Sequence, residues 1–137
     1  MRIDVHPFKD IAEAREWARI EIDNAAGAAR TRYITVTAGQ DATYQAKYAD
    51  ALAFARAGYP EDQVAQYPWV QTEALATGVT PRAAADSIKA VGDPWNMVIG
   101  PMIEGLRIGG KTKLDTLATI GAIVAHTRTV RAELDRA

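Results

Sequence analysis

The sequence has no cysteine and few aromatic residues, and its positive and negative charges nearly cancel. Among 137 residues, 7% are aromatic and the formal net charge is −1. Without cysteine the chain cannot form disulfides, thiolate zinc ligands or a thiol nucleophile. A nearly neutral chain lacks the basic surface that displaces counterions from nucleic acid. We therefore expect neither thiol chemistry nor a nucleic-acid partner.

Long apolar runs are also missing. No stretch approaches the roughly 20 apolar residues of a membrane-spanning helix. Residues 1–8 contain no apolar core of the length found in signal peptides. We expect a chain made in the cytoplasm, without a membrane partner.

What is present favours helix. Alanine, the residue with the highest helix propensity, is plentiful, and the 48% apolar and 24% charged fractions are those of a globular protein. The composition predicts a mainly α protein, a small helical bundle forming a single domain over 1–137. A short extended or β element is expected at residues 2–5, where apolar and polar residues alternate. A division into two helical subdomains near residues 58–68 is the alternative.

Helix start and stop signals mark the first half of the chain. Asp10 and Glu13 resemble a capping box, and apolar residues then recur with helical spacing to about Ala29. A second helix is expected over 41–57, with Gly58 as its stop. The link at 33–36 is rich in β-favouring residues and is expected to be extended. The predicted buried face of the second helix consists of Tyr44, Tyr48, Leu52 and Ala55.

The same signals recur after the second helix. A short helix is expected over 69–76, ending at Gly78. Thr80 then precedes Pro81, a typical N-cap followed by proline in the first turn. The helix that begins there is predicted to end at about Val91, before Gly92.

Further glycine and proline residues predict breaks in the last third of the chain. Pro101 is expected to kink a helix or to begin a new one. The Gly109-Gly110 pair predicts another break, and a final amphipathic helix is expected from about Lys113 to Glu133. Its predicted apolar face consists of Leu117, Ile120, Val124, Val130 and Leu134.

One segment matches the phosphate-loop expression G-x-x-x-x-G-K-T, over residues 105–112. Phosphate binding there needs a buried strand before the loop and a helix after it. The preceding residues include Pro101 and Glu104, which do not suit a buried strand. We interpret the segment as a Gly-Gly hinge between helices and keep nucleotide binding as an alternative.

Residues for catalysis or metal binding do not form a recognisable group. The two histidines, His6 and His126, are far apart and belong to no ligand pair. Four carboxylates are expected in caps and loops, where they serve helix ends; these are Glu61, Asp62, Asp86 and Asp93. We expect no catalytic residue, no metal site and no cofactor, and hence a protein that is not an enzyme.

Aromatic residues are the remaining candidates for a function. Three tryptophans, Trp17, Trp69 and Trp95, are expected to anchor the core. Tryptophan and tyrosine are also enriched at the centres of protein interfaces, and the aromatic residues near Pro60 and Pro68 are predicted to be exposed. The candidate partner-binding residues are Tyr59, Tyr67, Trp69 and Trp95.

Three blocks of sequence resemble small alanine-rich bacteriophage proteins associated with tail fibres. The blocks are AAGAARTRYITVTAGQDATYQAKYADALAFA at 25–55, YPWVQTEALATGVTPRAAADSI at 67–88, and W…IGPMIEGLRIGGK at 95–111. The chain departs from that pattern at Pro101 and in its longer C-terminal helix. The resemblance brings no catalytic residues with it.

This resemblance implies a helical component of a phage virion, made in the bacterial cytoplasm. It would dock other tail or fibre proteins by protein–protein contact, and we expect a homo-oligomer. One alternative is a tail-fibre assembly chaperone that is absent from the mature virion. The other, from a different class, is the small nucleotide-binding protein or enzyme suggested by residues 105–112.

Overall fold

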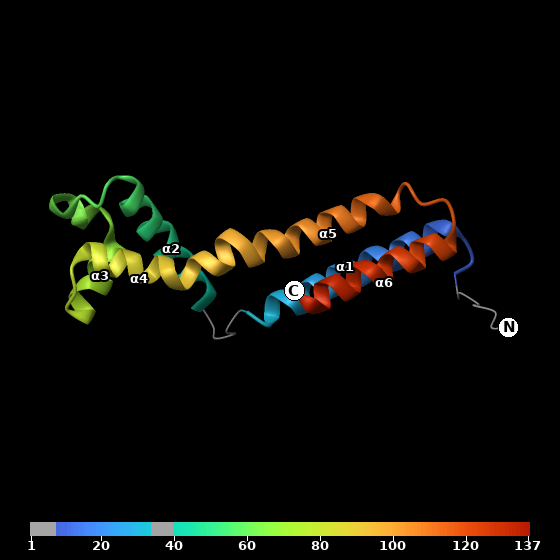
Figure 1. Ribbon diagram of the computed structural model, residues 1–137, viewed down its shortest axis with the longest axis horizontal. Helices are drawn as coiled ribbons and strands as arrows, with labels where there is room; N and C mark the ends of the chain where they lie inside the picture. The colour runs from blue at the N-terminus through green and yellow to red at the C-terminus, as the bar shows by residue number, and fades with distance from the viewer. Residues whose placement is uncertain (1–7, 34–39) are drawn as a thin grey trace. The chain divides into compact units, whose positions relative to one another are not determined.

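The structure is a computed structural model that describes residues 8–33 and 40–137, which contain helices and no strand (Figure 1). The chain divides into two compact units. The first unit joins Met1–Tyr33 to Ile99–Ala137, and the second is Ile34–Val98. The mainly α prediction is confirmed, whereas residues 2–5, predicted to be extended, lie outside the described residues. The predicted point of subdivision, 58–68, lies inside the second unit.

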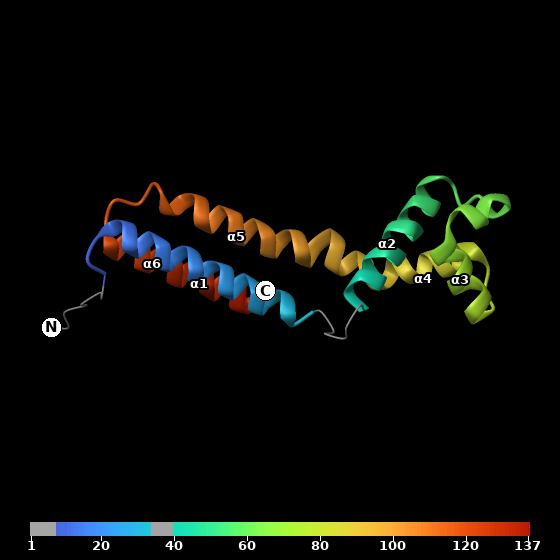
Figure 2. The ribbon, with the colours of Figure 1, turned by 180° about the vertical axis from the view of Figure 1, so that it is seen from behind.

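The first unit contains α1 (Ile11–Thr31), α5 (Gly100–Leu114) and α6 (Ile120–Arg136). The helix α1 packs against both of the others, which the two opposite views make visible (Figures 1 and 2). Small alanine side chains on α1 let branched side chains of the other helices pack close to its backbone. The buried residues include Ala14, Ala18, Ile22, Ala26 and Ala29 of α1, Ile103 and Leu114 of α5, and Ile123, Val124, Val130 and Leu134 of α6.

The predicted start of α1 is confirmed. Asp10 is the N-cap, and its carboxylate accepts a hydrogen bond from the backbone N–H of Glu13 at 2.9 Å. The Glu13 carboxylate in turn accepts from the backbone N–H of Lys9 at 3.4 Å. One N–H of the first helical turn and the N–H just before the N-cap are thus satisfied by side chains within four residues, which explains why sequence alone located this boundary.

The second unit contains α2 (Gln40–Arg56), the short 3₁₀ helix η1 (Glu61–Gln66), α3 (Pro68–Thr77) and α4 (Pro81–Asp93). The π-helical segment η2 (Pro94–Ile99) follows α4. The core of this unit is one apolar cluster that includes Ala51, Phe54, Val70, Ala85 and Ile88.

The buried face of α2 differs from the predicted one. Tyr44 is 49% exposed, whereas Tyr48, Ala51 and Phe54 are buried. The predicted face is therefore wrong, and the buried face is rotated from it by a fraction of a helical turn. Phe54 rather than Tyr44 fills the space between α2 and the following helices.

Three turn signals of the second unit are confirmed. Gly58 and Gly78 follow α2 and α3 with φ values of 85° and 71°, a backbone region that glycine enters without cost. The Thr80 hydroxyl accepts from the backbone N–H of Ala83 at 3.1 Å and so caps α4, and Pro81 occupies its first turn.

A carboxylate from α2 caps the N-terminus of α3. Tyr67 provides no side-chain cap, and Pro68 has no N–H. One Asp50 oxygen accepts from the N–H groups of Trp69 and Val70 at 2.8 and 3.0 Å.

We predict that Asp50→Ala lowers the free energy of unfolding of the second unit by about 1–2 kcal/mol, because two helix N–H groups lose their acceptor. Asp50→Asn keeps one acceptor oxygen and should therefore lower the free energy of unfolding by less than Asp50→Ala does. Urea unfolding followed by circular dichroism measures both. The exposed Asp62→Ala serves as control, and an equal loss in that variant would contradict the capping role.

Two predicted breaks are wrong. Gly92 lies inside α4, which continues to Asp93, and Gly109-Gly110 lies inside α5, which continues to Leu114. The break before the final helix comes instead after Leu114, and α6 begins at Ile120, capped by the Thr119 hydroxyl. Pro101 falls in the first turn of α5, directly after the π-helical segment η2.

Close side-chain packing explains the two helical glycines. A Cβ atom at Gly92 would lie 2.3 Å from Cδ1 of Tyr48, and one at Gly110 would lie 2.9 Å from Cγ1 of Val130. A glycine inside a helix costs about 1 kcal/mol relative to alanine. At these positions the packing that only glycine permits offsets that cost, and the local signal for a break is overridden.

The tryptophans do not form the core as predicted. Trp17 and Trp95 are half-buried, and Trp69 is 41% exposed. Trp17 packs against Phe8 with ring centroids 5.1 Å apart. The buried positions are held instead by smaller aliphatic side chains and by Phe54, in keeping with the rarity of complete tryptophan burial.

Candidate functional site

Two of the four predicted partner-binding residues pack against the core of the second unit. Tyr59 and Tyr67 contact the buried Phe54 ring, with centroid distances of 5.8 and 5.0 Å. Both tyrosines are half-buried. The hydroxyl of Tyr59 donates to Asp86 at 2.7 Å, and this hydrogen bond raises the pKa of Tyr59. The guanidinium of Arg82 lies 4.3 Å from the centre of the same ring, a cation–π distance.

The other two predicted residues belong to different elements. Trp69 lies in the first turn of α3 and is exposed, whereas Trp95 lies half-buried in η2. The structure thus brings Tyr59 and Tyr67 together around Phe54. It leaves Trp69 as the most accessible of the four.

The sequence analysis missed a larger exposed apolar surface in the second unit. In α4 and η2, Val91, Met97 and Val98 are 76%, 66% and 61% exposed. From residue 87 to 98 the exposed side chains are all uncharged, because Lys89 and Asp93 are half-buried. We call this the α4–η2 face; it consists of Ser87, Ala90, Val91, Pro94, Met97 and Val98. The sequence analysis did not single out these residues, because helical periodicity alone does not say whether an apolar face is covered.

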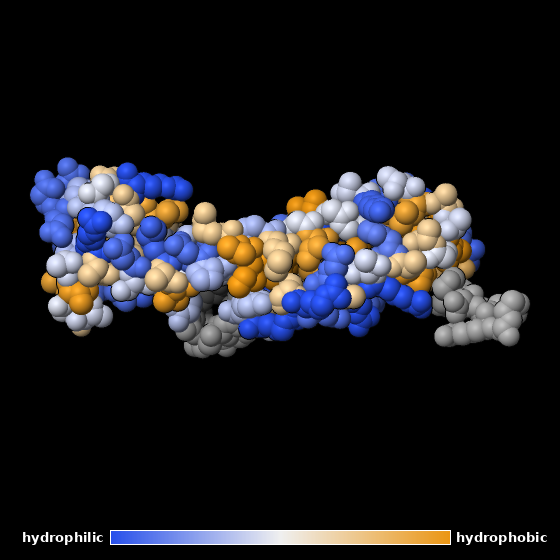
Figure 3. All heavy atoms as spheres, in the orientation of Figure 1, coloured by the Kyte–Doolittle hydropathy of each residue, from blue (hydrophilic) through white to orange (hydrophobic). Residues whose placement is uncertain are grey.

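The first unit has an apolar surface of its own on α5. Met102 and Ile108 are 42% and 51% exposed. Figure 3 shows hydrophobic residues gathered over the first half of this helix. The segment that matches the phosphate-loop expression is helical, and its residues Gly105, Ile108 and Gly109 are exposed. Residues 105–112 thus lack the loop that the nucleotide-binding alternative requires.

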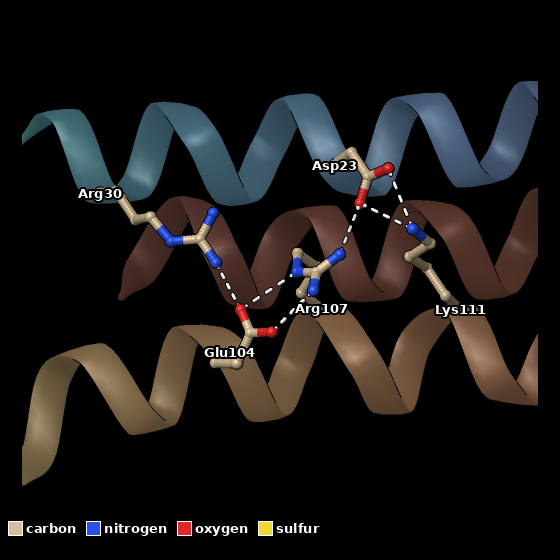
Figure 4. A network of polar contacts seen from close by, with 5 residues as sticks. All are labelled: Asp23, Arg30, Glu104, Arg107 and Lys111. Carbon is tan, nitrogen blue, oxygen red and sulfur yellow. Dashed lines mark hydrogen bonds and ion pairs between the residues drawn. The ribbon is translucent and has the colours of Figure 1, made fainter.

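Charged side chains join α1 to α5 in a network of five residues (Figure 4). The Asp23 carboxylate accepts from Arg107 at 3.2 Å and from Lys111 at 3.0 Å. The Glu104 carboxylate accepts from Arg107 at 2.7 Å and also pairs with Arg30. The charged side chains on this side of α5 thus face α1.

The network shifts the ionisation of its acids. Partial burial opposes ionisation of Asp23, but hydrogen bonds from Lys111 and Arg107 outweigh it and lower the pKa of Asp23. A hydrogen bond from Arg107 is the main cause that lowers the pKa of Glu104. Both acids are therefore held in their charged form when the protein is folded.

The lowered pKa values predict an acid-sensitive pairing of α1 with α5. An acid whose pKa falls on folding stabilises the folded state above its unfolded pKa, which is about 4. That stabilisation is lost as the pH falls through the lower folded pKa. We expect Asp23→Asn and Glu104→Gln to unfold at lower urea concentration than the parent chain at pH 7, and the difference to shrink as the pH falls below about 4, the unfolded value. The role of Asp23 and Glu104 would be contradicted if the difference in urea concentration of unfolding were unchanged at acid pH. It would also be contradicted if Asp62→Asn lowered that concentration equally.

His126 has a structural contact. Its Nε2–H donates to the backbone carbonyl of Gly110 at 2.8 Å, which joins α6 to α5. Among the side chains that the structure describes, in residues 8–33 and 42–137, no three acidic or histidine residues are placed to hold a metal ion. None of the described helices is long and apolar enough to cross a bilayer.

Comparisons with known proteins give no match. Protein-family profiles, curated proteins and solved structures were each searched, and none matched the chain.

Proposed function

We propose that the protein is a non-catalytic docking protein of a phage tail or tail fibre, which acts by protein–protein contact. The observation that carries the docking role is the α4–η2 face, where Val91, Met97 and Val98 are each more than half exposed. Large exposed apolar side chains grouped without charges are typical of surfaces that bind another protein. The resemblance of residues 25–55, 67–88 and 95–111 to phage tail-fibre-associated proteins supports the place of action.

Trp69, on α3 of the same unit, is the predicted aromatic residue best suited to add to such a surface, because it is 41% exposed. Tyr59 and Tyr67 are less suited, since they are half-buried and pack on Phe54 in the core of the unit. The partners we propose are other tail or fibre proteins.

The test replaces apolar groups of the α4–η2 face by charge in the phage that encodes the chain. Met97→Glu and Val98→Glu should reduce incorporation of the protein into particles at least tenfold, because a carboxylate would be desolvated at the contact. The purified variants should keep the circular dichroism spectrum of the parent. Thr72→Glu, also exposed in this unit, is the matched control. Normal incorporation of both Met97→Glu and Val98→Glu would overturn this surface as the docking site.

An assembly chaperone would use the same kind of surface but would leave before the particle is complete. The two roles differ in one observable: whether the protein is present in mature particles. The nucleotide-binding alternative has no comparable support, because residues 105–112 are helical and Lys111 is paired with Asp23.

A further inference from the structure

The chain passes from the second unit to the first through a helical segment. The second unit ends at Val98 and the first resumes at Ile99, and both residues belong to η2. The elements α4, η2 and α5 follow one another directly, so helical residues extend from Pro81 to Leu114. Such a stretch normally unfolds cooperatively, because each backbone hydrogen bond of a helix fixes the next residue.

Two prolines interrupt the hydrogen bonding of this stretch. Proline has no backbone N–H, and its ring collides with the carbonyl four residues earlier in an α-helix. For Pro94 and Pro101 these are the carbonyls of Ala90 and Met97. Pro94 keeps helical angles, with φ −56° and ψ −43°, and the residues that follow it are π-helical, a rare and usually short form. Two backbone donors are thus missing within residues 94–101, where the chain leaves one unit for the other.

The first unit is held together by contacts among its own helices. Arg15 of α1 donates to the carbonyls of Leu114 and Leu117 at 3.2 and 3.0 Å, and so binds the C-terminal end of α5. Arg32 donates in the same way to the carbonyl of Leu134 in the last turn of α6, at 2.7 Å. The charge network joins α1 to α5 as well (Figure 4). These bonds satisfy helix ends within the unit.

The second unit has its own core and its own polar contacts. The apolar cluster around Phe54 joins α2, α3 and α4. Tyr48 of α2 donates to Asp93 of α4 at 2.7 Å, and Lys47 of α2 pairs with Glu73 of α3 at 3.0 Å. Each unit therefore has the separate core that defines an independently folding domain.

We propose that η2 uncouples the folding of the two units, so that each unit unfolds in a transition of its own. Parts of a protein that open separately commonly coincide with compact units of this kind. The unit that carries the α4–η2 face can then open and close while the three-helix unit stays folded. This inference rests on the two cores and the two prolines, not on the docking role, so it can hold where the incorporation test fails, and the converse.

Tryptophan fluorescence in urea tests the two transitions in the full chain. Trp17 belongs to the first unit, whereas Trp69 and Trp95 belong to the second. One reporter chain keeps only Trp17, with phenylalanine at the other two positions, and a second reporter chain carries Trp17→Phe. Gly92→Ala should lower the urea midpoint of the second reporter and leave that of Trp17 unchanged. Gly110→Ala should do the reverse, because each added Cβ collides within its own unit.

The outcome is decisive even if a glycine variant unfolds one unit completely. Under the proposal, a Gly92→Ala chain whose second unit is unfolded without urea still shows the Trp17 transition at its usual midpoint. Asp50→Ala, a milder change in the same unit, then repeats the comparison. Equal shifts of both reporters by either glycine substitution would overturn the proposal, because the chain would then unfold as one cooperative body.

Replacing both prolines tests whether η2 is the cause. In a chain with Pro94→Ala and Pro101→Ala the two backbone donors are restored, so Gly92→Ala should now lower the Trp17 midpoint as well. Pro81→Ala is the matched control, because a proline in the first turn of a helix removes no internal hydrogen bond. The two transitions should stay separate in that control. If Gly92→Ala still affects only the second unit after both prolines are replaced, η2 is not the uncoupling segment.

Discussion

Replacing Gly110 by alanine should destabilise the first unit, whereas the same replacement at its neighbour Gly109 should not. The Gly110 position is buried, and an added Cβ would lie 2.9 and 3.2 Å from the two methyl groups of Val130 and 3.5 Å from Cδ1 of Ile22. Valine has few rotamers on a helix and cannot turn away. We expect Gly110→Ala to lower the free energy of unfolding by about 1–3 kcal/mol, the range for overpacking.

Gly109 provides the matched control because it occupies the same helix one residue earlier. An added Cβ there meets nothing within 4 Å. Gly109→Ala should therefore raise the free energy of unfolding by up to about 1 kcal/mol through helix propensity. Thermal and urea unfolding of both variants measure the difference. A stabilised Gly110→Ala variant would contradict the close packing of α5 on α6.

Gly92→Ala should destabilise the second unit by about 2–3 kcal/mol, near the upper end of overpacking effects. The added Cβ would lie 2.3 Å from Cδ1 and 2.9 Å from Cε1 of Tyr48. The Tyr48 ring cannot shift freely, because it is buried and its hydroxyl donates to Asp93 at 2.7 Å. That hydrogen bond also raises the pKa of Tyr48.

A double-mutant cycle isolates this clash from the general effect of the substitution. In a Tyr48→Ala background the steric conflict is gone, so Gly92→Ala should be neutral or stabilising by up to about 1 kcal/mol. Unfolding of the four chains in urea, followed by circular dichroism, gives the interaction energy. If Gly92→Ala lowered the free energy of unfolding equally in both backgrounds, the packing of α4 on Tyr48 would be contradicted.

Sequence reasoning located the boundaries that depend on neighbouring residues. The Asp10 cap, the left-handed Gly78 and the Thr80-Pro81 start each involve groups within a few residues, and the structure has all three. It was wrong at Gly92 and at Gly109-Gly110, where the local tendency to break a helix is opposed by contacts with α2 and α6. Those contacts come from residues far away in the sequence and leave no local signal.

The candidate surface was harder to predict than the fold. Tyr59 and Tyr67 stand next to turn residues, which suggested exposure, yet both pack on Phe54. Val91, Val98 and Met102 are exposed, and the sequence analysis made no prediction of their exposure. An apolar stripe has the same pattern whether it faces a core or a partner, so its surroundings had to be seen in three dimensions.

Mass spectrometry of purified mature particles, from the phage that encodes this chain according to our proposal, tests the proposed role most directly. The account predicts that the protein is present at a fixed ratio to a tail or fibre protein and remains after washing at high salt. Absence from particles, together with its presence in assembly intermediates, would contradict a virion component and would indicate the assembly chaperone instead.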